Sequence, residues 1–455
     1  MKIGIVGGGL MGLALAQRLT KLDHEVTVFE REQQLGGLTT YHDYGKFYWD
    51  RFYHVILPTD RQLIGFIQDL GLGDALRWRR TLTGFFVDKQ LHSLSSGFDF
   101  LRFPPLNFLS KCRLAFTILY CSKLKRWRRL EQIPVSRWLR KLSGETTYEK
   151  IWKPLLLAKL GSEYERVSAV FIWSYIARMF SARDRSTQKE QLGHVAGGYK
   201  TVFERLASVI ATGGGEIRSG VTVKRIEPRA GGGLSIECDD GKEFFDKIIF
   251  TSPVDVLQRT ASEQLTRLER RGEKVEYLGV ICMVLVTHKP LVPYYIVNIV
   301  DSRIPFTGII GLSNLAQTSE TAGFHVTYLP KYVHSDSPIL NQSDEMIRET
   351  FFAGLELMFP NWQTCGVESV HINRARRVQP LQVLNYSQLV PKIKSDHPDF
   401  YVLNTSQFTH MTLNNNEVVR AVDEFLADQR ATFQTVRDGN AAPRAMQIAT
   451  PAKAS

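Results

Sequence analysis

Three glycines near the start of the chain have the spacing that a bound dinucleotide requires. Gly7, Gly9 and Gly12 follow an apolar run at 2–6 and precede a helical pattern at 13–22. The first glycine allows a tight turn, the second lets backbone approach a pyrophosphate, and the third lets the helix pack closely on the strand. The amino end of that helix adds free N–H groups and the positive end of its dipole. The pattern therefore predicts a site for the phosphates of a dinucleotide.

An acidic residue follows at the position where a ribose would lie. A second apolar run, 25–29, ends at Glu30. A carboxylate about 20 residues after the glycines can accept hydrogen bonds from ribose hydroxyls. A lone glycine motif is a weak signal, whereas strand, glycines, helix, strand and acid in register are specific. A glycine-rich turn that binds nothing is therefore the less favoured interpretation.

The basic residues are concentrated in one part of the chain. The formal net charge is +11, and no acidic residue occurs between positions 100 and 130. Aromatic and aliphatic residues interleave with the basic ones there, as in a helix that lies on an anionic membrane surface. A helix packed on its own domain with a solvated basic face is an open alternative, and nucleic acid is less favoured because no recognised motif accompanies the charge. The basic residues are Arg102, Lys111, Arg113, Lys123, Lys125, Arg126, Arg128 and Arg129.

Cysteine usage and hydropathy limit the class of protein. The five cysteines are scattered, with no C-x-x-C pair, so we expect reduced, mostly buried thiols and no metal site. We expect no signal peptide, because the first strand starts at residue 2, and no apolar run reaches transmembrane length. The cysteines are Cys112, Cys121, Cys238, Cys282 and Cys365.

The 455 residues are too many for one simple core, so two domains or an interleaved pair are expected. Residues 90–190 have mainly helical periodicity, whereas β-branched and aromatic runs predict strands later in the chain. Residues 1–30 supply too few strands for a parallel sheet, and the later candidates are 247–250 and 400–403. Other expected elements are helices at 60–70, 200–210, 345–358 and 417–427, and strands at 216–217, 221–226, 234–238, 278–300 and 324–329.

Taken together, these segments resemble the FAD-dependent amine-oxidase superfamily. That group includes monoamine oxidases, protoporphyrinogen oxidases, phytoene desaturases and, more distantly, UDP-galactopyranose mutases. The similarity rests on the opening motif, Glu30, the Leu35-Gly36-Gly37 loop, the Gly197-Gly198 helix, the Val223-x-x-Ile226 strand and the closing strand–loop–helix.

The resemblance implies an α/β fold, in which a discontinuous Rossmann-type FAD-binding domain contains an inserted α+β substrate domain. The FAD-binding segments would be 1–90, 191–275 and 396–430. They would alternate with a helical insert facing substrate or membrane at 91–190 and a substrate-domain sheet and helix at 276–395. Residues 431–455 are expected to form a disordered tail.

The resemblance also implies which residues contact FAD. The first glycine turn would approach the pyrophosphate, Glu30 the adenosine ribose, the Gly36-Gly37 loop the phosphate and ribityl, and Val223 the adenine. The second glycine pair favours FAD over NAD. The full expected set is Gly7, Gly9, Leu10, Met11, Gly12, Glu30, Arg31, Gly36, Gly37, Leu38, Thr39, Val223, Asn404 and Thr405.

The carboxyl-terminal motif departs from the family. Members usually place Gly-Asp after the final strand, whereas this chain has Asn404-Thr405-Ser406. Asn404 could supply a neutral hydrogen bond in place of the aspartate. The helix near Glu417, capped from 414–416, would still direct its positive end at the flavin pyrimidine.

His54 is the candidate catalytic residue, because 54–60 is similar to the mutase segment in which a histidine lies beside the flavin. A histidine there could pass a proton to or from N5 or the substrate, although a half-buried loop histidine is an open alternative. Lys153 and Lys159 are expected at the surface. Solvated arginines at a strand edge are favoured over an acidic-substrate site for Arg374, Arg376 and Arg377.

The function that the resemblance implies is an FAD-dependent oxidoreductase. A hydride would pass to flavin N5 from a C–N or C–C bond of a small organic substrate (an amine, porphyrinogen or polyene). Alternatives are a redox-neutral sugar mutase acting on a nucleotide sugar and a catalytically altered FAD-binding scaffold. We expect a cytoplasmic protein, peripheral at the inner face of the membrane through 100–130, with no nucleic acid partner.

Overall fold

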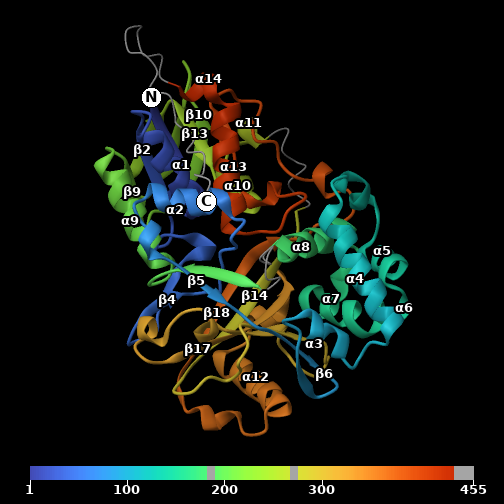
Figure 1. Ribbon diagram of the computed structural model, residues 1–455. Helices are drawn as coiled ribbons and strands as arrows, with labels where there is room; N and C mark the ends of the chain where they lie inside the picture. Colours follow the sequence, from blue (N-terminus) through green and yellow to red (C-terminus); the bar gives the residue numbers. More distant parts are fainter. Residues whose placement is uncertain (182–189, 267–274, 435–455) are drawn as a thin grey trace, which may run out of the picture.

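A computed structural model describes residues 1–181, 190–266 and 275–434. Figure 1 shows three parts: a parallel sheet with its helices at the end where the amino terminus lies, a second sheet at the opposite end, and a group of helices to one side. Segments far apart in sequence build each of the two sheets. The α/β fold class and the discontinuous Rossmann-type organisation expected from the sequence are confirmed.

The parallel sheet begins with β1 (Lys2–Val6) and β2 (Glu25–Glu30), which are joined by α1 (Leu10–Thr20). Three later segments complete it, and all of its pairs are parallel. The strand order is β19-β13-β1-β2-β9, with β9 at Glu216–Ser219, β13 at Lys247–Phe250 and β19 at Phe400–Val402. The strands at 247–250 and 400–403 therefore complete the sheet as predicted.

Alternate residues of these strands enter two different cores, as the two-residue period of a strand requires. Ile3 and Ile5 pack with α1, α2 (Arg61–Asp69), α9 (Tyr199–Thr212) and α13 (Asn415–Asp428). The opposite face packs against a small antiparallel sheet, where a Cβ on Gly4 would lie 2.9 Å from the Ile236 side chain. The strands of that small sheet are β10 (Arg225–Pro228), β11 (Leu234–Cys238) and β12 (Gly241–Phe245).

The second sheet has seven strands around β14 (Tyr277–Thr287), whose residues are all buried. One face of β14 packs under α12 (Asp344–Met358), and the other packs against residues 44–57 and Leu192. The order is β18-β14-β17-β16-β15-β6-β7, formed by Val367–Pro380, Tyr277–Thr287, His325–His334, Gly308–Gly311, Ile296–Ile299, Thr83–Val87 and Gln90–Ser93.

The side helices form a separate core between the two sheets and the solvent. Trp138, Tyr148 and Trp152 are buried in it. The helices are α3 (Gly97–Arg102), α4 (Phe108–Lys123), α5 (Val135–Ser143), α6 (Glu145–Thr147), α7 (Lys153–Leu160) and α8 (Ala169–Ser181). Among the described residues, no helix has the length and apolarity needed to cross a bilayer.

Two short ribbons connect the parallel sheet to the seven-stranded sheet. One pairs β3 (Tyr41–Asp43) with β4 (Tyr48–Asp50), and the other pairs β5 (Leu76–Arg80) with β8 (Gln191–Val195). Helices α10 (Val254–Thr260) and α11 (Glu263–Thr266) follow β13.

Three details differ from the sequence-based expectations. The boundary expected at residue 90 is misplaced, because β6 pairs with β15 of the seven-stranded sheet. The strand expected at 221–226 begins only at Arg225, since the backbone of Val221 bonds to Glu30 instead. The expected tail at 431–455 begins too early: α14 (Arg430–Phe433) is ordered, and Phe433 is buried against His24 and Tyr401. Residues 435–455 lie outside the described part of the chain.

The thiols are as expected from the sequence. All five cysteines are free, and Cys121, Cys282 and Cys365 are buried. Burial raises the pKa of the Cys121 thiol to about 12, so that thiol remains protonated at neutral pH.

Candidate active site

The first glycine turn forms an anion site at the carboxyl edge of the parallel sheet. Gly7 has a φ of 117°, and a Cβ on Gly12 would lie 1.9 Å from the Gly7 carbonyl oxygen. Helix α1 begins directly after Gly9, without a side-chain cap and without an acidic residue in its first turn. The helix dipole and the free N–H groups therefore face this edge unopposed. Because Leu10 and Met11 have buried side chains, they can meet a ligand there only through backbone.

Glu30 lies beside this turn at the end of β2. Its Oε2 accepts a hydrogen bond from the Gly8 N–H at 2.7 Å, and its Oε1 accepts one from the Glu32 N–H at 2.9 Å. No lysine or arginine in the described part of the chain pairs with it. A carboxylate has about four acceptor positions. Two therefore remain for ribose hydroxyls.

The second glycine loop packs directly on the first. The Gly36 N–H donates to the Gly8 carbonyl at 2.9 Å, and a Cβ on Gly37 would lie 3.3 Å from the Gly9 Cα. Gly36 has a φ of 109°, so a side chain there would be strained. Only backbone is therefore available where the two loops meet, as the sequence motif predicts.

The other residues expected to contact the cofactor lie along the same edge. Their side chains differ in burial and in the protein groups that already bind them. Val223 is buried two residues beyond Val221, whose N–H donates to the Glu30 carbonyl. Thr39 is buried, and its hydroxyl donates to Asn415 Oδ1 at 3.1 Å, which brings the start of α13 to the second glycine loop. Leu38 is half-buried, and the exposed Arg31 side chain pairs with Glu32.

Asn404 is held entirely by protein groups. Its Oδ1 accepts hydrogen bonds from the Ser406 N–H and hydroxyl, and its Nδ2 donates to the Ser252 carbonyl at 3.1 Å. Its side chain is only 2% exposed, whereas Thr405 is half-buried. We therefore propose that Asn404 positions the loop after β19 and does not contact the cofactor itself.

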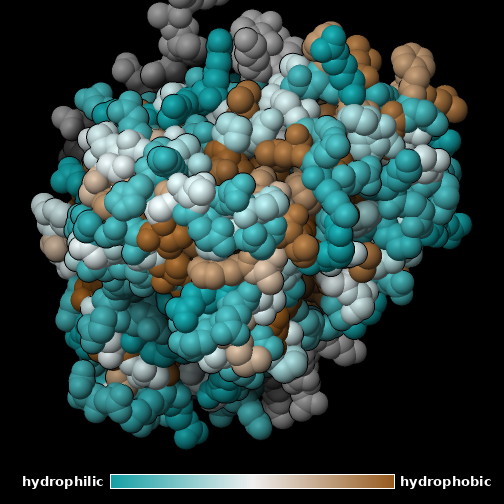
Figure 2. Space-filling model, turned by 90° about the horizontal axis from the view of Figure 1, so that it is seen from below, coloured by the Kyte–Doolittle hydropathy of each residue, from teal (hydrophilic) through white to brown (hydrophobic). Residues whose placement is uncertain are grey.

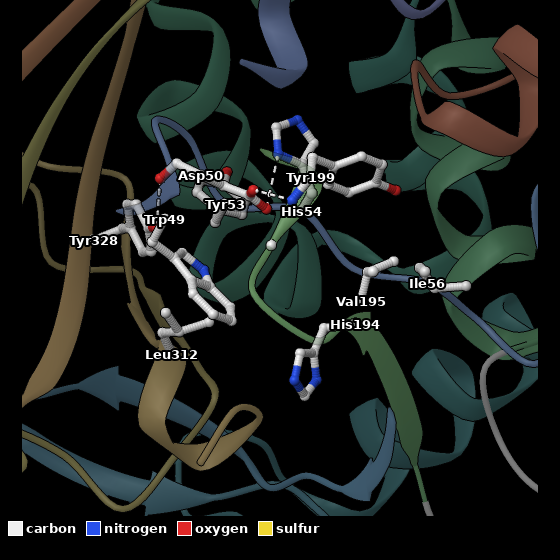
Figure 3. A pocket seen from close by; sticks show the side chains of 11 residues that line it. Trp49, Asp50, Tyr53, His54, Ile56, His194, Val195, Tyr199, Leu312 and Tyr328 are labelled. Atoms are coloured by element: carbon white, nitrogen blue, oxygen red, sulfur yellow. Dashed lines mark hydrogen bonds and ion pairs between the residues drawn. The ribbon is translucent and has the colours of Figure 1, made fainter. Parts of the chain in front are cut away.

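A small cavity lies between this edge and the seven-stranded sheet. Figure 3 shows that its walls come from both ribbons, from the start of α9 and from the second sheet. The lining is mainly aromatic and aliphatic: Trp49, Asp50, Tyr53, His54, Ile56, His194, Val195, Gly198, Tyr199, Leu312 and Tyr328. The expected catalytic candidate, His54, is among these residues.

Contacts connect the carboxyl edge of the parallel sheet (the cofactor edge) to this cavity. Asn415, which accepts the hydrogen bond from Thr39, lies at the start of α13. The ring of Tyr199 lies 5.6 Å from that of His54, edge to face. The Tyr199 N–H donates to Asp50 Oδ1 at 2.7 Å. The cavity therefore lies next to the end of the cofactor edge that is nearest α13.

Asp50 and His54 form a buried pair whose charges are both disfavoured. The Nδ1 of His54 lies 3.9 Å from Oδ2 of Asp50 and has no hydrogen-bond partner. Burial raises the pKa of Asp50 to about 7, although the Tyr199 N–H lowers it in part. Burial lowers the pKa of His54 to about 4. At neutral pH His54 is therefore a neutral base, and Asp50 holds a proton in part of the molecules.

Lys159 is not the exposed residue that the sequence favoured. Its Nζ lies 3.1 Å from the centroid of the Tyr332 ring, and burial lowers the pKa of this amine to about 7. The Tyr332 hydroxyl shares a 2.8 Å hydrogen bond with Tyr53 of the cavity wall. Lys159 therefore lies behind that wall. Lys153 forms an exposed ion pair with Glu149, as a surface lysine would.

The three arginines of β18 lie at strand edges, as favoured. They bond to groups outside the cavity: Arg374 to Asp344, Arg376 to Asn341 and Arg377 to Asp255.

Sequence reasoning missed Asp50, Tyr199 and His194 as members of the site. The one local signal for Asp50 as a site residue was its position four residues before His54 within an aromatic stretch. Tyr199 and His194 come from a distant segment, so only the tertiary fold brings them to the cavity.

Comparison with known proteins agrees with this geometry. The sequence model of the family described as flavin containing amine oxidoreductase matches residues 10–372. The chain belongs to this family. Its members are flavin-containing amine oxidoreductases, and FAD is the cofactor that this membership implies for the chain.

Individual relatives match less of the chain. AofH of Mycobacterium tuberculosis, described as a flavin-containing monoamine oxidase, is 24% identical over 263 residues, which are 55% of this chain and 56% of AofH. The glutamate synthase small chain of the same species is 56% identical over 39 residues, which are 9% of this chain and 8% of that protein. This chain thus spans only part of the length of the curated relatives that it matches.

Solved structures share the fold over nearly the whole length. A protein of Exiguobacterium sp. 255-15, described as a protoporphyrinogen oxidase, has a TM-score of 0.72 at 19% identity, covering 94% of this chain and 98% of that one. Reduced UDP-galactopyranose mutase has a TM-score of 0.71 at 16% identity, covering 94% of each chain. At these identities the similarity concerns the fold alone.

The residues present fit FAD. The uncapped α1, the two open acceptor positions on Glu30 and the side-chain-free contact of the glycine loops each match one part of a dinucleotide. We propose that these groups hold the pyrophosphate and the adenosine ribose, and that the start of α13 faces the flavin.

Replacing Glu30 with Gln should weaken FAD binding by about 1–3 kcal/mol, because an amide leaves a ribose hydroxyl without its acceptor. The measurement is the FAD dissociation constant, from flavin fluorescence during dialysis. Glu25→Gln, an exposed change at the other end of β2, is the control. Equal affinity in Glu30→Gln and the wild type would contradict the assignment.

Replacing Asp50 with Asn should stabilise the protein more at pH 8 than at pH 5. The native state keeps the Asp50 proton up to about pH 7, whereas an unfolded aspartate releases it near its ordinary value of 3.8. The free energy of unfolding of the wild type therefore falls as pH rises through this window, and Asn removes that fall of about 2–3 kcal/mol between pH 5 and pH 8.

Urea unfolding at the two pH values measures the difference. The contribution of His54 is common to both proteins and cancels in the comparison. Asp336→Asn, at a side chain that is 88% exposed, should show no such dependence. A stabilisation that is the same at both pH values would show that Asp50 is ionised throughout.

Proposed function

We propose that this protein oxidises a C–N or C–C bond of an organic substrate beside Asp50 and His54, by removing a hydride from one carbon of that bond and a proton from the neighbouring atom. FAD, when bound, accepts that hydride at N5. The observation that supports this proposal is the position of a closed aromatic cavity next to the α13 end of the cofactor edge. The reaction would thus take place where the Rossmann-type domain meets the second sheet.

The chain's own residues would act by positioning, exclusion of water and proton transfer. Trp49, Tyr53 and Tyr328 place apolar ring surface around the substrate, which favours its uncharged form. The unpartnered Nδ1 of His54 is free to take a proton from a substrate nitrogen or carbon. Asp50, only 3.9 Å away, can stabilise the imidazolium that results or accept its proton.

The substrate classes that fit are an amine, a porphyrinogen or a polyene. Each presents an uncharged, largely apolar body in the form that reacts, as the lining requires. A monoamine oxidase is among the curated relatives, and a protein described as a protoporphyrinogen oxidase shares the fold. The functions described for these two proteins support the proposal.

A sugar mutase is the less favoured enzyme. A nucleotide sugar carries a diphosphate, which a protein normally meets with arginine or lysine. The lining of the cavity includes neither residue type. A scaffold without chemistry is supported by the altered Asn404 motif alone.

The test is anaerobic reduction of the purified, flavin-loaded protein by a panel of amines, porphyrinogens and polyenes. We expect one class to bleach the flavin. His54→Asn should slow that bleaching by about 100-fold or more, because a positioned base is lost, while FAD content stays unchanged. Stopped-flow absorbance of the flavin measures both.

His288→Asn, an exposed change outside the cavity lining, is the matched control. Bleaching only by dithionite or a nicotinamide donor, together with retention of a UDP-sugar, would favour the mutase. A flavin that stays oxidised with every class in the panel would contradict the proposed oxidation.

We also propose that α3 and α4 rest on an anionic membrane surface at the cytoplasmic face. Helix α4 turns its small buried face, Leu114, Thr117 and Cys121, toward its own domain. Large apolar side chains point outward instead: Phe108 is 74% and Leu109 is 68% exposed. The others exposed on these helices are Phe98, Leu101, Phe116, Leu119 and Tyr120.

This pattern favours a membrane over a solvated basic helix, because the outward face is apolar as well as basic. Lys123, Lys125, Arg126 and Arg128 are exposed just after that face. Figure 2 shows the face of the molecule seen from below, where hydrophobic residues gather across the middle of a mainly hydrophilic surround.

Changing Lys123, Lys125, Arg126 and Arg128 to Gln together should release the protein from phosphatidylserine vesicles. Each basic residue near such a surface contributes about 1 kcal/mol, so affinity should fall at least 100-fold. Vesicle sedimentation measures the bound fraction.

Phosphatidylcholine vesicles, which lack net charge, are one control. A variant with four other exposed basic residues changed to Gln is the second, at Lys224, Arg225, Arg229 and Lys242. Wild-type protein that stays unbound at moderate salt would end the membrane proposal.

A further inference from the structure

A second hollow opens outside the inner cavity, along the β5–β8 ribbon. It is lined by Arg77, Trp78, Arg79, His194 and Glu320, among others. His194 lines this outer groove and the inner cavity as well. Figure 3 shows the ring of His194 below the Asp50–His54–Tyr199 group and pointing away from it. The groove therefore adjoins the inner cavity at His194.

The ribbon places positive charge at this opening. Arg77 pairs with His194 across the two strands, and Arg79 pairs with Leu192. Cross-strand partners share a face, so Arg77 and Arg79 lie on the face that carries His194. Arg77 donates to the Asp74 carbonyl, and Arg79 donates to the Ser313 carbonyl at 3.2 Å.

These bonds leave most of each guanidinium unused. A guanidinium has five N–H donors. In the described part of the chain, no carboxylate pairs with Arg77 or Arg79. The positive charge of the groove is therefore not neutralised by the protein.

The one carboxylate named in the lining is already engaged. Glu320 Oε1 accepts hydrogen bonds from His194 Nε2 at 3.0 Å and from the Gln317 N–H at 3.3 Å. Its Oε2 accepts one from the Gly197 N–H at 3.1 Å. Glu320 therefore fixes the His194 ring and the α9 turn, and leaves the two arginines free.

A second observation points to a ligand at the same place. His194 is only 7% exposed, and its Nδ1 has no hydrogen-bond partner. Because Nε2 donates to Glu320, Nδ1 is an acceptor, so a donor group of a ligand, such as a hydroxyl or an amide N–H, would satisfy it. The exposed ring of Trp78 adds apolar surface beside the arginines.

We propose that Arg77 and Arg79 bind an oxyanion group of the substrate, a carboxylate or a phosphate, in the outer groove. The remainder of the substrate passes His194 and presents its oxidisable bond in the inner cavity. This inference rests on the proposed function, and it adds that the substrate is amphipathic: apolar where it reacts and anionic at its outer end. Arginine suits this role because its planar fork matches a carboxylate or phosphate.

The test is calorimetric titration of the full, FAD-loaded protein with three probes of similar shape. They are 4-phenylbutanoate, its neutral amide, and 3-phenylpropyl phosphate. We expect at least one anion to bind ten-fold or more tightly than the amide, and added salt to reduce that preference. The preferred anion identifies the group as carboxylate or phosphate.

Arg77→Gln with Arg79→Gln should abolish the preference, while Arg77→Lys with Arg79→Lys should retain part of it. A matched control, Arg137→Gln with Arg348→Gln, removes two exposed charges from α5 and α12 and should leave the preference intact. Circular dichroism and FAD content confirm that each variant is folded.

The inference is overturned if neither anion binds better than the amide, if no probe binds, or if the Gln pair keeps the preference. These outcomes are separate from failure of the proposed function. That failure would appear as a flavin that no substrate class reduces, whereas these titrations measure binding alone.

Discussion

The buried backbone and carboxylate of Asp50 hold the two halves of this molecule together. The carboxylate accepts the Tyr199 N–H at the start of α9, and the carbonyl accepts the hydroxyls of Tyr328 at 2.7 Å and Tyr44 at 3.2 Å. Tyr328 belongs to β17 of the second sheet, whereas α9 packs on the parallel sheet. One residue thereby fixes the distance between the cofactor edge and the opposite wall of the cavity. A Cβ on Gly198 would lie 2.8 Å from Asp50 Oδ1, so this junction also requires glycine in the α9 turn.

The same burial determines the chemistry at the junction. Asp50 and His54 both lose hydration, and each is driven toward its neutral form, so the pKa of the acid rises while that of the base falls. Near neutral pH part of the molecules hold Asp50 as a carboxylate, and a carboxylate beside a neutral imidazole can take up one proton without creating an isolated charge. Such a pair suits a site where a substrate must lose a proton as a hydride leaves it.

Local sequence could predict the features whose contacting residues lie close together along the chain. The glycine turn, Glu30 and the Gly36–Gly37 loop lie within about 40 residues of one another and meet through backbone groups. The strands expected at 247–250 and 400–403 are short apolar runs in the sequence. His194, Tyr199 and Arg77 could not be found in this way, because their roles depend on strand pairing between segments more than 100 residues apart. Lys159 was misjudged for the same reason: its burial comes from Tyr332 of a different domain.

The loop after β19 departs from the family motif at position 404. We propose that Asn404 keeps the shape of the loop and leaves contact with the cofactor to other residues. An aspartate at position 404, which is only 2% exposed, would place a carboxylate next to the Ser252 carbonyl oxygen. A carboxylate has no N–H to donate to that oxygen. Asn404 donates to that carbonyl and accepts from Ser406, so the loop keeps its shape without a buried charge. In the proposed binding mode, FAD would then depend more heavily on the other end of the edge, where Glu30 and the uncapped α1 supply charge and dipole. Those groups would hold the adenosine ribose and the pyrophosphate, and the flavin ring would be oriented by α13 and the cavity wall.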